Sequence, residues 1–226
     1  ELGSSSHATI AHYYDYRGRL IARINPTAPH EVFAYDNMNR VTAVGMYSSS
    51  SGFSSSSVPT TTTNRVGFSE TWFDEMGRVY KTTRHKINSS GTSTDSIDSL
   101  TWYDPVGRVI KQDGPDLVKT RFDRLGRMTH RYTLANDNDT ADTYSHVYDS
   151  STKAVDVAGD IVLEEDQWTL DPSDGNAIMI ARVHRLHGDY STGETGGALD
   201  TNADGDALLY TAANLKGRPQ ITSMWY

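Results

Sequence analysis

The amino-acid sequence predicts an all-β fold, in the form of an extended or superhelical array of antiparallel β-hairpins. Three observations lead to this prediction. Tyrosine occurs 13 times in 226 residues, and this residue type favours a pleated, half-buried surface. The hydrophobic fraction is 36%, which is low for a compact enzyme. A short turn motif also recurs five times in the first 135 residues, and internal repetition of this kind is typical of repeat architectures.

The repeated motif has the form aromatic-Asp-x-x-Gly/Asn-Arg-aliphatic. From average residue usage, one match in a chain of this size has a probability on the order of 10⁻³, so the repetition is not accidental. The aromatic, Asp, Gly or Asn, and Arg positions of the copies are Tyr14, Asp15, Gly18 and Arg19; Tyr35, Asp36, Asn39 and Arg40; Phe73, Asp74, Gly77 and Arg78; Tyr103, Asp104, Gly107 and Arg108; Phe122, Asp123, Gly126 and Arg127.

Each position of the motif suits a β-hairpin turn. The Asp carboxylate can accept hydrogen bonds from backbone N–H groups two residues further on. Pro105 occupies a type I turn position that favours a φ of about −65°. The Gly position then requires a positive φ, which forms a bulge and restores the strand twist. Asn39, the one exception, is the non-glycine residue type that tolerates this conformation best.

The motif resembles the YD repeat of RHS proteins, toxin-complex shells and the teneurin ectodomain. The resemblance covers residues 10–132, roughly half of the chain. It implies that the hairpins wind into a spiral sheet, which in that family often encloses a chamber. It also implies that the partners of these hairpins are neighbouring YD repeats or copies of the chain itself. The motif is specific for the fold and says little about function.

We expect two regions in the chain. Residues 1–135 hold the regular hairpins, with Ser/Thr-rich loop insertions at about 47–64 and 88–99. Residues 136–226 are expected to form degenerate, longer hairpins that continue the same sheet, with an acidic loop at 200–206. The Ser/Thr-rich loops are either plain flexible insertions or O-glycosylated or recognition loops. Asn88 and Asn138 begin two N-glycosylation sequons.

One acidic stretch is a candidate calcium loop. Asp200, Asn202, Asp204 and Asp206 alternate along the chain with a Gly turn between the last two, as at the start of EF-hand and dockerin-type loops. The twelfth position is Thr211 instead of a bidentate Glu. Calcium binding and an ordinary acidic hairpin turn are therefore both open interpretations. No other cofactor is required.

Several classes of function are disfavoured. The net charge of −8 and the scattered basic residues argue against nucleic-acid binding. The chain has no cysteine, hence no disulfide or Cys-ligated zinc, and no apolar run of membrane-spanning length. His184 and His187 would lie on opposite faces of a strand, which disfavours zinc. No nucleophile elbow, zinc-protease motif or phosphate-binding loop occurs, so we expect no enzymatic activity.

The sequence therefore predicts a non-enzymatic structural segment of a large secreted or cell-surface protein, forming a shell, stalk or extracellular filament. Two alternatives stay open. One is a carbohydrate- or cell-surface-binding module, in which aromatic residues such as Trp72 and Trp102 present stacking faces to sugars. The other is the wall of a toxin-encapsulating cage, which the family resemblance permits. We expect an extracellular or cell-surface location and a parent chain longer than these residues.

Overall fold

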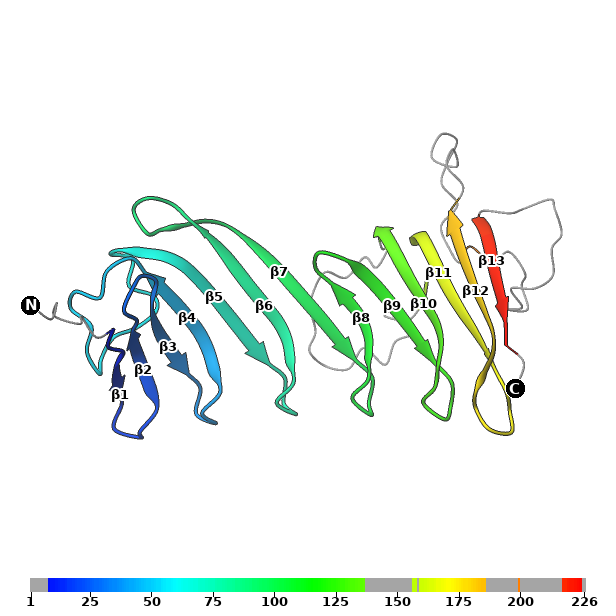
Figure 1. The fold of residues 1–226 in the computed structure, drawn as a ribbon, viewed down its shortest axis with the longest axis horizontal. Coiled ribbons are helices and arrows are strands. Elements are labelled where there is room, and N and C mark those ends of the chain that lie inside the picture. Colours follow the sequence, from blue (N-terminus) through cyan, green and yellow to red (C-terminus); the bar gives the residue numbers. More distant parts are fainter. Residues whose placement is uncertain (1–7, 137–155, 158, 186–198, 200–216, 225–226) are drawn as a thin grey trace, which may run out of the picture. The chain divides into compact units, whose positions relative to one another are not determined.

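The computed structural model of the chain describes residues 8–136, 156–157, 159–185, 199 and 217–224 (Figure 1). None of these residues is helical, so nothing in this part of the chain could cross a membrane as a helix. The prediction of an all-β hairpin array is confirmed. The strands are β1 (Ala11–Tyr14), β2 (Leu20–Ile24), β3 (His30–Tyr35), β4 (Val41–Tyr47), β5 (Arg65–Phe73), β6 (Val79–Ile87), β7 (Ser93–Tyr103), β8 (Val109–Asp113), β9 (Leu117–Phe122), β10 (Met128–Asn136), β11 (Ile161–Leu170), β12 (Ala177–Arg185) and β13 (Gly217–Ser223).

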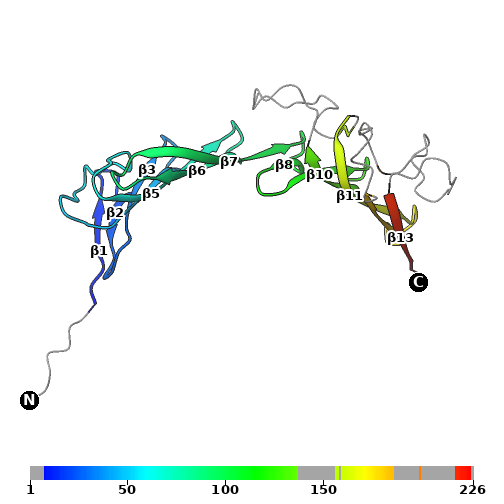
Figure 2. The ribbon, with the colours of Figure 1, turned by 90° about the horizontal axis from the view of Figure 1, so that it is seen from above.

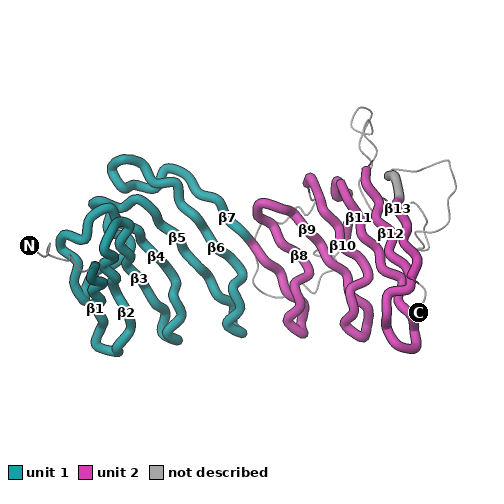
Figure 3. Tube along the Cα trace, in the orientation of Figure 1, with its two compact units in different colours: residues 1–99 teal, residues 100–226 magenta. Residues whose placement is uncertain are grey.

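The strands follow one another in the sheet in their chain order, β1 to β13. Every strand pair whose register is defined is antiparallel. This order is what a run of hairpins produces, since each strand pairs with the next. The chain divides into two compact units, unit 1 at residues 1–99 and unit 2 at residues 100–226 (Figure 3).

A β-bulge accompanies the repeated turns. The register shifts by one residue just before the turn, for example between Tyr13 and Tyr14 and between Trp72 and Phe73. Such a shift is expected where a type I turn is followed by a residue of positive φ. In each unit, these turns lie at one end of the strands (Figure 1).

In unit 1, the core lies under a chain segment that covers one face of the sheet. Ala22, Val32 and Tyr47 are buried at 0–2% exposure, and Tyr13 and Phe53 pack against them. Phe53 belongs to the loop between β4 and β5, which folds back over the strands instead of projecting from them (Figure 2). The cross-strand row beneath this loop consists of Tyr13, Ala22, Val32, Gly45, Phe68 and His85.

In unit 2, a corresponding row carries charged side chains. It consists of Trp102, Lys111, Lys119, Tyr132, Glu165 and Val183. Lys119 is 0% exposed and Glu165 is 1% exposed. Val157 and Leu199, which precede and follow the β11–β12 hairpin, cover the row and share a hydrophobic cluster with Tyr132 and Val183.

The structure differs from the sequence prediction at residues 88–99. This Ser/Thr-rich stretch was expected to be a loop insertion, but residues 88–92 form a tight turn and Ser93 already begins β7. Thr and Ser are compatible with an exposed strand, and the low apolar content reflects exposure rather than lack of structure. The other insertion is a true connection between Tyr47 and Arg65. The acidic loop at 200–206 lies outside the described residues.

Candidate functional site

The Asp of each repeated turn binds the backbone and the Arg of its own turn. In the first turn, Asp15 Oδ1 accepts hydrogen bonds of 2.9 Å from the N–H groups of Arg17 and Arg19. Asp15 Oδ2 accepts one of 2.7 Å from Arg19 Nε. The same Asp–Arg side-chain bond measures 2.5–2.6 Å in the other four copies of the motif. The carboxylate therefore closes the turn and orients the Arg at the same time.

The turn geometry explains the Gly or Asn position. The φ angles are 76° at Gly18, 82° at Gly77, 94° at Gly107 and 86° at Gly126, and Asn39 has 65°. An L residue with a side chain rarely adopts such angles, and Asn is among the few that do. The motif thus encodes a backbone conformation as well as a set of contacts.

These hydrogen bonds lower the pKa values of the turn carboxyls. The N–H and guanidinium of Arg40 hold the pKa of Asp36 below its usual value, and Arg127 does the same for the pKa of Asp123. Burial acts in the opposite direction at Asp104, yet the hydrogen bonds from Arg108 outweigh it and the pKa is again lowered. Each Asp is consequently ionised at neutral pH.

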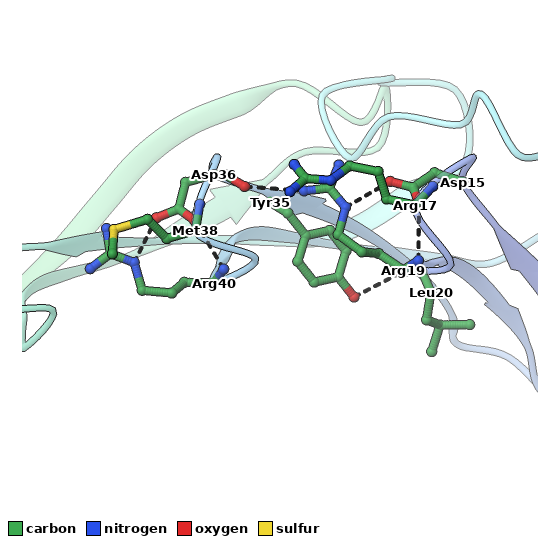
Figure 4. Close-up of polar contacts among 8 residues, drawn as sticks. All are labelled: Asp15, Arg17, Arg19, Leu20, Tyr35, Asp36, Met38 and Arg40. Atoms are coloured by element: carbon green, nitrogen blue, oxygen red, sulfur yellow. Dashed lines mark hydrogen bonds and ion pairs between the residues drawn. The ribbon is translucent and has the colours of Figure 1, made fainter.

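The Arg of one turn also reaches the next turn. Arg19 Nη1 donates a 3.1 Å hydrogen bond to the carbonyl of Asp36, and its guanidinium lies over the Tyr35 ring, 5.0 Å from the centroid. In the opposite direction, the Tyr35 hydroxyl donates to the carbonyl of Leu20 at 2.8 Å. Figure 4 shows this pair of turns, with the side chains of Arg19 and Arg40 pointing in the same direction along the edge of the sheet. Successive hairpins are thus linked outside their strand pairing.

Three more arginines repeat one of these two contacts within their units. Arg40 lies 4.4 Å from the centroid of the Phe73 ring, and Arg108 lies 4.5 Å from that of Phe122. Arg127 Nη1 donates to the carbonyl of Asp171 at 3.3 Å. We refer to Arg19, Arg40, Arg108 and Arg127, with the aromatic rings and carbonyls they contact, as the arginine ladder.

Two further turns share this geometry but were not recognised in the sequence. Asp171 accepts from the N–H of Ser173 at 2.7 Å, and Gly175, with a φ of 79°, donates to the Asp171 carbonyl. One extra residue before the Gly hid this copy, although its Asp-Pro start matches Asp104-Pro105. Asn88 forms the second turn, since its Oδ1 accepts from the N–H groups of Ser90 and Thr92.

A hydroxyl, an imidazole and a carboxylate line up across β7, β6 and β5. Ser93 Oγ lies 2.9 Å from His85 Nδ1, and His85 Nε2 lies 2.8 Å from Glu70 Oε2. This order of groups is that of a hydrolase triad. However, Ser93 is exposed and the Glu70 side chain is 34% exposed, so the surrounding water weakens the electrostatic interactions within this group. The group depends on strand register and was not visible in the sequence.

The tryptophans proposed as sugar-stacking faces are already in contact with lysines. Lys81 Nζ lies 5.2 Å from the centroid of the Trp72 ring, and Lys111 Nζ lies 4.6 Å from that of Trp102. Both pairs are cross-strand neighbours in the sheet. A sugar would have to compete with an ammonium group for these ring faces, which favours the interpretation that the tryptophans pack within the sheet.

The remaining candidate sites fall in different places. Asp200, Asn202, Asp204 and Asp206 lie outside the described residues, as does Asn138. Asn88 is exposed, and its side-chain oxygen holds the turn described above. Glycosylation there stays a prediction. Among the described residues, no three His, Asp or Glu side chains are placed to hold a metal ion.

Comparison with known proteins finds similar solved structures. A mutant Tc holotoxin pore of Photorhabdus luminescens is 15% identical, with a TM-score of 0.34, over 78% of this chain and 9% of that chain. The TcdB2–TccC3 crystal structure is 14% identical, with a TM-score of 0.35, over 80% of this chain and 10% of that chain. No family model and no curated protein matches. The chain thus spans about a tenth of those chains, and at such TM-scores the likeness supports no functional conclusion.

Proposed function

We propose that this chain is a non-enzymatic structural segment of a large secreted or cell-surface protein. In this role its stacked hairpins form part of a shell, stalk or extracellular filament. The observation that carries the proposal is the arginine ladder. Each of its guanidiniums binds its own turn and extends to the next one, so that consecutive hairpins are held together in sequence. A repeat protein derives its stability from such nearest-neighbour contacts.

The ladder can be tested with a matched pair of variants in unit 2. Arg108→Ala removes the Nε hydrogen bond to Asp104 and the contact with Phe122 but keeps the backbone N–H bond, and it should lower the free energy of unfolding by about 2 kcal/mol. Arg124→Ala removes an exposed arginine from a neighbouring turn and should change it by less than about 0.5 kcal/mol. Equal urea midpoints for the two variants would remove the main support for a structural role of the ladder.

Electron microscopy of the parent protein tests the structural role itself. Fibres or tubes would support a filament or stalk, and closed hollow particles would support a shell or cage wall. Separate globular particles of the parent protein, neither hollow nor joined into fibres, would contradict the proposal.

The proposed lack of enzymatic activity needs a separate test. The Ser93–His85–Glu70 group is the best place for it, because its order of groups is that of a hydrolase triad. Incubation of the intact chain with a fluorophosphonate probe should leave Ser93 unlabelled, as judged by peptide mass spectrometry. Labelling of Ser93 that His85→Ala abolishes would show an activated serine and would contradict a purely structural role.

A further inference from the structure

The connection between β4 and β5 lines a small open pocket in unit 1. The pocket has a volume of about 240 Å³. Its walls include Ser51, Phe53, Ser56, Thr61, Thr63 and Asn64, and no charged residue lines it. We propose that this pocket binds one neutral sugar residue, either as a free monosaccharide or as the terminal residue of a glycan. The proposal does not depend on the structural role proposed above.

The connection is held in place by two side chains of the sheet. The Tyr47 hydroxyl lies 2.9 Å from the carbonyl oxygen of Pro59 and 3.0 Å from that of Thr61. Arg65, which is 7% exposed, donates from Nη1 to Pro59 and from Nε to Gly91, at 3.3 and 2.9 Å. The bonds from Tyr47 and from Arg65 Nη1 engage the backbone of the connection, whereas Arg65 Nε binds Gly91 in the β6–β7 turn. Within the connection, the Ser54 and Ser56 hydroxyls bind each other and the Ser57 hydroxyl accepts from the Ser54 N–H.

Two glycines give the connection room to approach the sheet. A Cβ at Gly45 would lie 2.9 Å from the carbonyl oxygen of Pro59 and 2.8 Å from the Tyr47 ring. A Cβ at Gly91 would lie 1.7 Å from the carbonyl oxygen of Thr62. Contact this close fixes the position of the connection on the sheet. The pocket is therefore preformed, and a ligand would not have to order it on binding.

The lining favours a neutral polyhydroxylated ligand. Each Ser or Thr hydroxyl can both donate and accept hydrogen bonds, as sugar hydroxyls do. Within the described part of the chain, the hydroxyls of Ser51, Thr61 and Thr63 have no hydrogen-bond partner. Phe53 supplies an apolar ring for the C–H face of a sugar. An anionic ligand would find no positive charge in the wall, and the chain carries a net charge of −8.

The volume limits the size of the ligand. Pockets for drug-sized molecules usually measure about 300–1,000 Å³, and this one is smaller at about 240 Å³. One sugar ring fits that space better than an oligosaccharide. A ligand of this size makes few contacts, so we expect a dissociation constant in the millimolar range, on the order of 1 mM.

The test uses saturation-transfer NMR on the intact chain with a panel of neutral hexoses and N-acetylhexosamines, and with glucuronic acid as the charged counterpart. At least one neutral sugar should bind and glucuronic acid should not. The Ser51→Ala/Thr63→Val double variant should weaken binding by about tenfold or more, which corresponds to about 1.4 kcal/mol. Ser55→Ala, an exposed serine of the same connection outside the pocket lining, should bind as the parent does.

A further variant separates pocket position from pocket lining. Gly91→Ala leaves every lining residue unchanged but displaces Thr62, so it should also reduce sugar binding. Thermal melts of each variant confirm that it is folded. Binding of glycans on an array, together with the free sugar, would identify a glycan terminus, whereas binding of the free sugar alone would identify a monosaccharide. No binding of any neutral sugar at about 10 mM, or equal binding by the double variant and the parent, would overturn the proposal.

Discussion

In unit 1, the central row of the sheet has no Lys, Arg, Asp or Glu, and it is covered by the uncharged connection between β4 and β5. In unit 2, the central row carries Lys111, Lys119 and Glu165 and is covered by segments that bring their own polar groups. Lys119 Nζ donates to Asp160 Oδ2 and to the carbonyl of Asp156, both at 2.7 Å. Glu165 accepts a 2.8 Å hydrogen bond from the N–H of Leu199.

The difference shows two ways to attach a covering segment to a β-sheet. A neutral cover depends on close fit, because its backbone must approach the strands at Gly45 and Gly91. A charged cover depends on complete pairing, because an isolated charge in a buried site is strongly unfavourable. Unit 1 should therefore be sensitive to added atoms and unit 2 to the loss of one partner. The following predictions test this comparison.

The largest effect is expected from Lys119→Met in unit 2. This change leaves the buried Asp160 without its ammonium partner and should lower the free energy of unfolding by about 3–5 kcal/mol. The double variant Lys119→Met/Asp160→Leu replaces both charges and should recover most of that loss. Urea unfolding measures both, and hydrogen exchange localises the change to unit 2. A double variant as unstable as the single one would show that the pair is not the cause.

Gly91→Ala should have the next largest effect, in unit 1. The residue has a φ of 78°, and a Cβ there would collide with the Thr62 carbonyl. The backbone conformation alone costs about 1–3 kcal/mol for a residue with a side chain. Gly52→Ala is the matched control, since its φ is 84° but nothing lies within 4 Å of the added Cβ. Hydrogen exchange at residues 48–64 should rise more in Gly91→Ala than in Gly52→Ala, which has only the backbone cost; an equal rise in both variants would contradict the close-fit explanation.

Tyr47→Phe should have a smaller effect on the same cover. It keeps the ring that packs edge-on against Phe53 at 5.3 Å and removes the hydroxyl that contacts the Pro59 and Thr61 carbonyls. We expect a loss of about 1 kcal/mol, measured by urea unfolding. Tyr16→Phe, at a position 95% exposed, should leave the stability unchanged. If the two variants unfold alike, the hydroxyl does not hold the connection.

The smallest effect is a loss of stability at low pH. Both units should show it, because the same turns occur in both. The pKa of Asp36 and that of Asp123 are lowered in the folded state. A depressed folded-state pKa contributes stability above the unfolded value, about pH 4, and the contribution is lost as the pH falls through the folded value. Melting temperatures should therefore fall below about pH 4.

The Asp36→Asn variant should show a weaker acid dependence than the parent, since its side chain no longer titrates. Glu75→Gln, at an exposed position one residue after the Asp of the third turn, should keep the dependence of the parent. Identical acid profiles for Asp36→Asn and the parent would show that the Asp36 carboxylate does not contribute to the pH response.

The repeated turns could be read from the sequence because every contact that defines them lies within four residues. The Asp carboxylate, the positive φ and the following Arg are all local, so the motif predicts them directly. The turns at Asn88 and Asp171 use the same chemistry, but both lack the Arg and the second also has an extra residue. Part of the turn motif was therefore present in both segments, but too little of it to be recognised in the sequence.

The sequence by itself determined the fold class, the positions of five hairpin turns and the conformation of their glycines, because short-range hydrogen bonding and sterics decide these. The tertiary structure alone decided which face of each unit is covered, why Lys119 and Glu165 are buried, and how the Ser/Thr-rich connection forms a pocket. These features depend on strand register and on segments far apart in the chain. A lysine in an alternating strand has the same local pattern whether its face meets water or an acidic cover, so only long-range packing distinguishes the two.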